Sequence, residues 1–209
     1  AVDGTEVAVI CDVTAFHAEG GGQLGDIGTI TAPTGVIEVT VTKKLPDGAT
    51  IMVGNVVEGV VNVGEEVTFA VQSNRKNDIA RNHTATHLLH AALKQVLGSH
   101  VNQAGSYVGP DRLRFDFSHF SQVTEAELKE VEAIVNEEIL AGKDVAIEEL
   151  PIEEAKKRGA TALFGEKYGD VVRVVTVPEF SMEFCGGSHV SNTAQIGMFK
   201  IISEASTGA

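Results

Sequence analysis

Two pairs of residues that could bind a metal stand about a hundred positions apart in this sequence. His83 and His87 are four residues apart in RNHTATHLLH, so on a helix their side chains would be neighbours. Cys185 and His189 are four apart in CGGSH, where two glycines allow a tight backbone path that turns both side chains inward. A thiolate and three imidazoles form the tetrahedral N/S ligand set that Zn²⁺ prefers. The combination predicts one zinc site.

Each pair alone has simpler explanations. Two histidines four residues apart are as well explained by chance, and only the second pair changes this interpretation. A zinc peptidase would need a glutamate directly after the first histidine as general base, but Thr84 stands there. A purely structural zinc stays open, because one cysteine and three histidines would close its coordination shell. His90 is expected beside the site rather than as a ligand.

A glycine-rich loop is the second candidate site. Gln23 directly follows Gly20, Gly21 and Gly22, and Thr14 precedes them on a stretch with strand-like alternation. A simple hairpin turn would explain the glycines. Such a loop also lets the backbone approach a ligand closely, and the Gln23 amide can both donate and accept hydrogen bonds. The loop lacks the Gly-Lys-Ser/Thr ending of a phosphate-binding loop.

The first histidine pair requires a long helix, which the sequence predicts with Ser73 or Asn74 as its cap, running to about Leu97 and ended by Gly98. One stripe of this helix has the spacing of a packing face and consists of Ala85, Leu88, Leu89, Ala92 and Val96. The three histidines fall on the opposite side together with Ile79 and Ala80. The histidine side is therefore also expected to be covered rather than open to solvent.

The remaining pattern predicts an α+β fold in two domains. Residues 1–72 consist of short alternating runs separated by turn signals, typical of a small β-barrel or curled sheet. Residues 73–209 predict an α+β domain. Thr124 with Glu127 forms a capping box before a second helix, and PIEEAKKRGA predicts a shorter helix beginning at Pro151. VVRVVTV and GMFKIIS predict buried strands.

Composition excludes several classes of protein. The formal net charge is −13, from 16 basic and 29 acidic residues, so no polybasic nucleic-acid-binding patch is expected. Two cysteines do not make a disulfide framework. No apolar run approaches the roughly 20 residues that span a bilayer, so we expect a cytoplasmic protein without a membrane partner. Both ends of the sequence suggest a piece of a longer chain. No Ser/His/Asp triad or pair of catalytic acids is evident.

Four motifs together resemble the editing domain of alanyl-tRNA synthetase. They occur in the order FHAEGGGQLGD, NHTATHLLHAAL, ALFGEKYGD and CGGSHVSNTAQIGMFKIISE, and they run through nearly the whole chain. The related free-standing alanyl-tRNA editing proteins share the glycine loop and the two metal-ligand pairs. The third motif is more similar to the synthetase than to those smaller proteins.

The resemblance implies a small N-terminal β-barrel followed by an α+β editing domain like that of threonyl- and alanyl-tRNA synthetases. It implies an aminoacyl-tRNA deacylase that hydrolyses the ester of mischarged Ser-tRNA(Ala) and Gly-tRNA(Ala). Its expected partners are the acceptor end of tRNA(Ala) and the rest of the synthetase chain. A free-standing editing protein and a non-catalytic, zinc-stapled interaction module are the alternatives.

The resemblance also implies roles for single residues. The zinc ligands are expected to be His83, His87, Cys185 and His189. The substrate-binding residues are expected to be Thr14, Gly20, Gly21, Gly22 and Gln23. The residues expected to take part in catalysis are Thr14, Gln23, His83 and His87. His17 stands where the smaller relatives commonly have tyrosine, so its role does not carry over.

Overall fold

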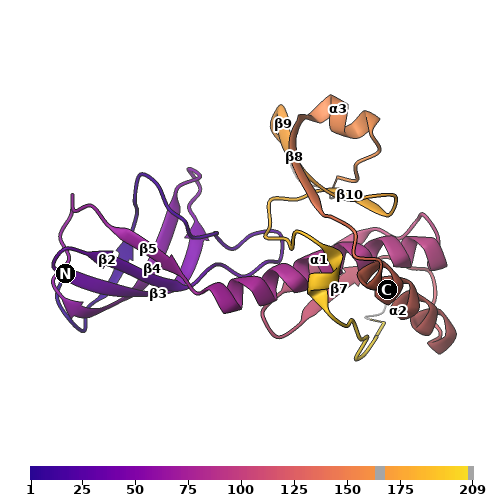
Figure 1. The fold of residues 1–209 in the computed structure, drawn as a ribbon, viewed down its shortest axis with the longest axis horizontal. Helices are drawn as coiled ribbons and strands as arrows, with labels where there is room; N and C mark the ends of the chain where they lie inside the picture. Colours follow the sequence, from indigo (N-terminus) through magenta and orange to yellow (C-terminus); the bar gives the residue numbers. More distant parts are fainter. Residues whose placement is uncertain (163–167, 207–209) are drawn as a thin grey trace. The chain divides into compact units, whose positions relative to one another are not determined.

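The computed structural model describes residues 1–162 and 168–206, and these form an α+β protein with antiparallel sheets (Figure 1). The chain divides into two compact units, Ala1–Asp78 and Ile79–Ala209. The division falls within the long helix α1 (Ser73–Leu97), which follows the last strand of the first unit. The expected α+β class is therefore confirmed, and each unit is described by itself below.

The first unit is built on one antiparallel sheet of five strands. The strands are β1 (Glu6–Val9), β2 (Gly28–Ala32), β3 (Gly35–Lys44), β4 (Thr50–Gly59) and β5 (Thr68–Val71). Their hydrogen-bonded order is β1-β4-β3-β2-β5. Alternate side chains of β3, such as Ile37 and Val39, enter the core, whereas Glu38 and Thr40 are exposed.

The sheet of the first unit is open rather than a closed barrel. Over residues 1–78, all of which are described, β1 and β5 are the two edges and no strand pairing joins them. The expected β-barrel is thus replaced by an open five-stranded sheet. The alternation of apolar and polar residues could not distinguish a barrel from an open sheet, because it shows only that one face of the sheet is buried and does not show whether the edge strands pair.

In the second unit two helices pack on a shared core. α1 is covered on both sides: Leu88 and Ala92 are 0 % exposed on one, and Ile79 is 0 % exposed on the other. The helix α2 (Glu125–Leu140) adds Val131 and Val135 to the same core. The predicted end of α1 at Leu97 and the capping box of Thr124 with Glu127 are confirmed, whereas Ser73, expected as a possible cap, is already the first residue of the helix. A helix that is buried all round has a weak amphipathic pattern.

A three-stranded antiparallel sheet completes the core of the second unit. Its order is β10 (Ser181–Phe184), β9 (Val171–Val177) and β8 (Ala146–Pro151). Side chains on the two faces of β9 enter different apolar clusters. Val175 and Val177 belong to the cluster that contains residues of α1, and Val172 and Val174 belong to a second cluster. The predicted strand VVRVVTV is confirmed, and both of its faces are covered.

The smaller elements of this unit are a hairpin and two short helices. The hairpin consists of β6 (Gln103–Val108) and β7 (Leu113–Phe117). The helix α3 (Ile152–Lys157) begins after Pro151, as predicted, and packs by Ala155 in the cluster of Val172 and Val174. A single 3₁₀ turn covers Thr193–Ile196.

The strand predicted over GMFKIIS is wrong. Residues 197–203 form no strand, and Met198 and Ile202 are 82 % and 88 % exposed. Side chains of α2 take the place of a partner strand: the Asn136 amide bonds both the N–H and the carbonyl of Phe199, and the Glu132 carboxylate accepts the Ile201 N–H. An apolar run alone therefore does not establish a strand, because its backbone groups can be hydrogen-bonded by side chains as well as by a neighbouring strand.

Candidate metal centre

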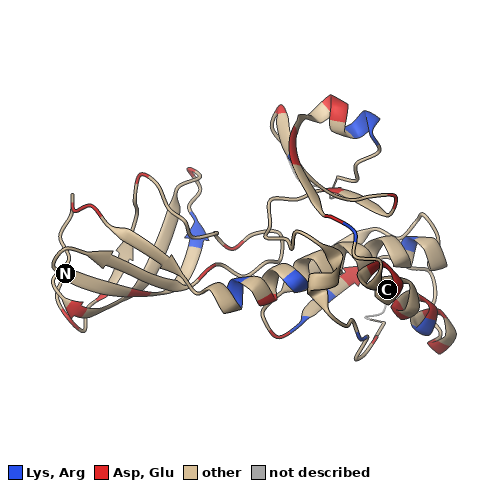
Figure 2. Ribbon diagram, viewed as in Figure 1, with Lys and Arg blue, Asp and Glu red and all other residues tan. Residues whose placement is uncertain are grey.

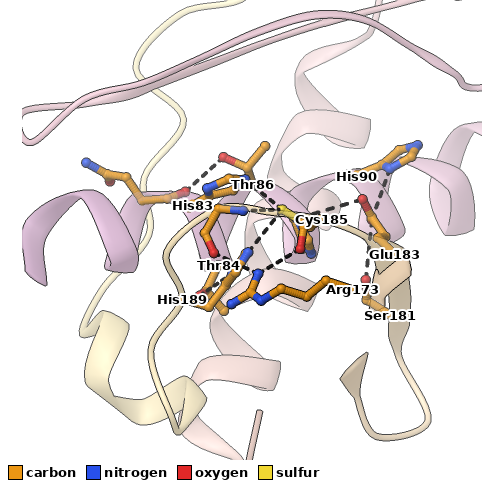
Figure 3. Close-up of polar contacts among 12 residues, drawn as sticks. His83, Thr84, Thr86, His90, Arg173, Ser181, Glu183, Cys185 and His189 are labelled. Carbon is orange, nitrogen blue, oxygen red and sulfur yellow. Dashed lines mark hydrogen bonds and ion pairs between the residues drawn. The ribbon is translucent and has the colours of Figure 1, made fainter. Parts of the chain in front are cut away.

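Three histidines and one cysteine meet in the second unit, and Figure 3 labels His83, Cys185 and His189 of this group. Each of His83, His87, Cys185 and His189 offers one possible ligand atom, and these four atoms all lie within 4.8 Å of one another. The Cys185 Sγ is 3.3 Å from the His83 Nε2 and 3.2 Å from the His189 Nε2. The structure therefore brings the two distant sequence pairs into one group.

The two pairs arrive by different local structures. His83 and His87 are one turn apart on α1, and the two residues are 6 % and 4 % exposed. Cys185 directly follows β10, and its N–H continues the sheet ladder by donating to the carbonyl of Arg173 at 3.0 Å. His189 follows after the two glycines. The sheet thus fixes the cysteine, and the helix fixes the histidine pair.

The donor set fits a zinc ion. Bond lengths of ~2.0–2.1 Å to nitrogen and ~2.3 Å to sulfur place neighbouring ligand atoms of a tetrahedral zinc about 3.3–3.6 Å apart. The two nitrogen–sulfur distances, 3.3 and 3.2 Å, are a few tenths of an ångström shorter than a tetrahedral nitrogen–sulfur pair, so the ligand atoms are close enough to share one ion after a small outward shift. The His87 Nδ1 is buried and has no hydrogen-bond partner among the described residues. These side chains can hold a metal ion.

The imidazoles are electrostatically suited to that role. Burial, followed by the nearby His87 and His83, lowers the pKa of His189 well below its ordinary value. Burial also lowers the pKa of His87, and Glu183 only partly opposes this effect. Neutral imidazoles have a free nitrogen lone pair, which is the form that ligates a metal.

The loop that carries Cys185 and His189 is held by an arginine of the sheet. The guanidinium of Arg173 donates to the carbonyl of Cys185 at 2.7 Å and to the carbonyl of Gly187 at 2.9 Å (Figure 3). The Gly187 N–H in turn points to the Cys185 Sγ at 3.4 Å. These bonds pair the loop's carbonyls with a positive charge and leave the thiol facing the histidines.

A buried carboxylate lies on the other side of the histidines. Glu183 is 7 % exposed, and its Oε1 is 3.1 Å from the His90 Nδ1, while its Oε2 is 3.9 Å from the His87 Nε2. Burial alone would raise the pKa of Glu183, but His87 and the bond with His90 lower it below its ordinary value. His90 thus contacts the carboxylate and lies outside the group of four.

Two contributors to this region were missed from the sequence, although a signal existed. Arg173 and Glu183 are charged residues within apolar strands, VVRVVTV and SMEF, where charge is unfavourable unless it is paired. Because side chains alternate along a strand, Glu183 and Cys185 point to the same face. That alternation would have placed a carboxylate beside the metal ligands.

The glycine loop belongs to the first unit and forms a tight turn. Gly20 and Gln23 exchange backbone hydrogen bonds of 3.1 and 3.0 Å. Gly21 and Gly22 have φ of 57° and 83°, which is the left-handed conformation that a two-residue hairpin turn requires at both central positions. Gln23 is 0 % exposed. The simple hairpin explanation accounts for two of the three glycines.

Thr14 lies in an irregular segment and not on a strand, because β1 ends at Val9. The expected strand placement is wrong. The Thr14 hydroxyl accepts the N–H of Phe16 at 3.1 Å and lies 3.2 Å from the Met52 Sδ. A threonine hydroxyl that accepts the backbone N–H of the residue two positions later stabilises a local turn, which competes with strand pairing. The side chain remains partly exposed.

Comparisons with known proteins relate this chain to aminoacyl-tRNA synthetases. Residues 1–75 match the family model of class II (A) tRNA synthetases, and residues 172–209 match the second additional domain of threonyl and alanyl tRNA synthetases. The chain is 56 % identical over 207 residues to an alanine–tRNA ligase of Bacillus pumilus and 57 % identical over 206 residues to that of Listeria innocua. It is homologous to a segment of alanine–tRNA ligases.

The match covers 99 % of this chain but only 24 % of the Bacillus pumilus ligase and 23 % of the Listeria innocua ligase. The chain therefore spans about a quarter of the length of these alanine–tRNA ligases. The resemblance to the alanyl-tRNA synthetase family is confirmed. Of the four motifs that carried it, ALFGEKYGD lies partly outside the described residues, since 163–167 are not among them.

Two further observations concern the surface charge of the chain and its helices. Figure 2 shows acidic positions, coloured red on the ribbon, distributed over both units. Within residues 1–162 and 168–206, none of the helices combines the length and the apolar character that a membrane span requires.

Arg173→Met should destabilise the second unit. The change removes the charged donor that bonds the carbonyls of Cys185 and Gly187, at a cost of about 1.5–3 kcal/mol in free energy of unfolding. Urea denaturation followed by circular dichroism measures it. Arg114→Met is the control, because this 64 %-exposed arginine pairs only with Asp116 two residues away, and its midpoint should hardly move. Equal midpoints for both variants would contradict the loop-holding role.

Proposed function

We propose that this chain is a zinc-containing editing domain that hydrolyses the aminoacyl ester of mischarged Ser-tRNA(Ala) and Gly-tRNA(Ala). The observation that carries the proposal is the meeting of His83, His87, Cys185 and His189 within 4.8 Å in a chain homologous to alanine–tRNA ligases. Cys185 and His189 lie in the segment that matches the second additional domain of threonyl and alanyl tRNA synthetases.

The chemistry of alanine selection explains why such an activity is needed. Glycine is one methyl group smaller than alanine, and serine adds a single hydroxyl. A small pocket discriminates such substrates by only about 10–200-fold. A second, hydrolytic site removes the errors if it recognises a feature that the first site could not exploit. For serine, that feature is the side-chain hydroxyl.

The residues of the metal centre have defined roles in this proposal. His83, His87, Cys185 and His189 would hold the ion, and Arg173 keeps the Cys185 backbone in place. When bound, zinc supplies Lewis acidity and fixes its ligands in position. Because the sequence offers no triad or acid pair for a covalent route, direct attack of water on the ester is the simplest chemistry.

The glycine turn supports a role in substrate binding. Gly21 and Gly22 are explained by their positive φ, but Gly20 is not in that conformation. A Cβ at Gly20 would meet only the Ala18 carbonyl oxygen, at 4.0 Å. No contact with the described residues therefore requires glycine at position 20, whereas close approach of a ligand to the backbone would require it. Thr14 and Gln23 are assigned to the aminoacyl group on the family resemblance.

Partners and location follow from the same proposal. The substrate is the acceptor end of tRNA(Ala), and the remaining parts of the synthetase chain supply the other functions, in the cytoplasm. With a net charge of −13, phosphate attraction to this segment alone is weak. Recognition of the tRNA body is therefore delegated to those other parts.

Deacylation assays test the proposal directly. The purified 209-residue chain is incubated with Ser-tRNA(Ala), Gly-tRNA(Ala) and Ala-tRNA(Ala) carrying a labelled amino acid, and release of the label is followed. We expect release of serine and glycine well above the buffer rate, and much less release of alanine. A zinc-loaded, folded chain that releases none of them would leave a non-catalytic interaction module as the better description.

The two cysteines provide a matched test of the metal site. The wild-type chain should bind about one zinc, as four ligands imply. Cys185→Ala removes a ligand and should strongly reduce zinc content, measured by elemental analysis, together with Ser-tRNA(Ala) hydrolysis. Cys11→Ala should change neither, because Cys11 is not one of the four clustered residues, and burial and then Asp12 raise the pKa of its thiol. Full zinc in Cys185→Ala, or equal loss in both variants, would refute the ligand assignment.

Thr14→Val tests how serine is recognised. The change preserves shape and removes the hydroxyl, which is worth about 0.5–1.5 kcal/mol as one neutral hydrogen bond. The ratio of Ser-tRNA(Ala) to Ala-tRNA(Ala) hydrolysis should therefore fall about 2–10-fold, with glycyl hydrolysis changing less. Thr40→Val is the control, since Thr40 is exposed on β3. An unchanged ratio in a folded Thr14→Val chain would move serine recognition to another residue.

A further inference from the structure

One buried hydroxyl contacts the metal centre without belonging to it. Thr84 follows His83 on α1 and is 0 % exposed. Its Oγ1 lies 3.0 Å from the His189 Nδ1, although the two residues are 105 positions apart (Figure 3). The same oxygen accepts the N–H of Val190 at 3.2 Å. The helix that supplies one ligand pair thus also contacts the backbone and the ring of the other.

The position of the His189 ring determines what this contact does. The His189 Nε2 faces the cluster, 3.2 Å from the Cys185 Sγ, so Nε2 is the nitrogen available to a metal. A neutral imidazole that ligates through Nε2 has its proton on Nδ1. In that tautomer the Nδ1–H donates to the Thr84 oxygen, 3.0 Å away. The hydroxyl thereby provides an acceptor for the tautomer that leaves the Nε2 lone pair free.

We propose that Thr84 is the positioning residue of the metal centre: its hydroxyl holds the His189 ring in the orientation and tautomer that can ligate. Partners that bond the second nitrogen of a ligating histidine fix its ring, and their loss typically weakens metal affinity about 10–100-fold. Here the partner comes from the opposite ligand pair. The proposal rests on the metal site proposed above.

The Val190 bond gives the hydroxyl a second task that must be separated from the first. By accepting that N–H, Thr84 also fixes the backbone immediately after His189 to α1. A loss of metal affinity could arise through the loop rather than through the ring. Only an effect that depends on the His189 imidazole supports the proposed role.

The chain offers a matched control on the same helix. Thr86 is also a buried threonine, 4 % exposed, and its Oγ1 donates to the Asn82 carbonyl of its own helix at 2.8 Å. Thr86→Val and Thr84→Val thus remove the same atom from similarly buried sites on α1. They differ in the partner that is lost, a helix carbonyl in one case and His189 with Val190 in the other.

The experiment measures zinc affinity of the 209-residue chain by competition with a chromophoric chelator. Thr84→Val should bind zinc about 10–100-fold more weakly than wild type. Thr86→Val should bind as wild type does, and Thr84→Ser, which keeps the hydroxyl, should restore most of the affinity. The visible spectrum of the Co²⁺-loaded chain should change in Thr84→Val alone, because only there does the ring lose its partner.

A double-mutant comparison separates ring from loop. In a His189→Ala chain, adding Thr84→Val should cost little further affinity, since the ring on which the hydroxyl acts is absent. A loss as large as in the wild-type background would mean that Thr84 acts only through Val190, and would overturn the proposal. So would wild-type affinity in Thr84→Val, or an equal loss in Thr86→Val.

The wild-type titration keeps the outcomes distinct. If the wild-type chain does not bind zinc, the proposed metal site itself fails. If it binds zinc and Thr84→Val binds equally well, only the role of Thr84 fails. Circular dichroism of the metal-free variants establishes that each is folded, and Thr84→Ala, which also lacks the hydroxyl, carries the test if the valine variant is not.

Discussion

Bringing three imidazoles and a thiol side by side, with His83 and His87 buried and Cys185 and His189 half-buried, is the constraint on which the second unit depends. Polar groups removed from water are unfavourable unless they find partners, and here the unpaired His87 Nδ1 has none within the described residues. One ion bound by all four side chains would satisfy them together. Two segments a hundred residues apart must then be held at bonding distance, which is the task of α1 and of the sheet that contains β9 and β10.

The sheet positions its ligand with backbone bonds rather than side-chain packing. The ladder continues one residue beyond β10, because Cys185 N–H bonds the Arg173 carbonyl, and the Arg173 side chain returns to bond the carbonyls of Cys185 and Gly187. One residue thus fixes the loop through its backbone and its guanidinium. The glycines leave the loop free to follow these bonds, since they add no side chain that must be accommodated.

Much of the second unit was predictable, because its signals are local or chemically specific. The end of α1 before Gly98 and the capping box at Thr124 depend on neighbouring residues, and the structure agrees with both; the start of α1 differs slightly, since Ser73 is its first residue and not its cap. Ligand chemistry pointed to the two metal-binding pairs. The role of residues 197–203 was not predictable in this way, since Asn136 and Glu132 replace a strand partner only in three dimensions.

The contacts of Thr84 and Glu183 were hidden for a related reason. Each lies beside a predicted ligand in the sequence, but its partner lies on the opposite pair: Thr84 bonds His189, and Glu183 bonds His90 and approaches His87. Spacing within one segment predicts which residues share a face, whereas the partner across the interface depends on packing. In the first unit, likewise, the open sheet and the turn at Thr14 depend on pairings that alternation does not encode.

The glycine turn is held in place by a buried carboxylate. Asp26, 1 % exposed, accepts the His17 N–H and the Lys76 ammonium on one oxygen, and its own N–H and carbonyl bond His17 and Thr42. These bonds close the base of the loop, while Gly21 and Gly22 set its tip. A loop already fixed in one conformation loses little entropy when a ligand binds. Gly21 and Gly22 therefore allow a tight, rigid turn rather than a flexible loop.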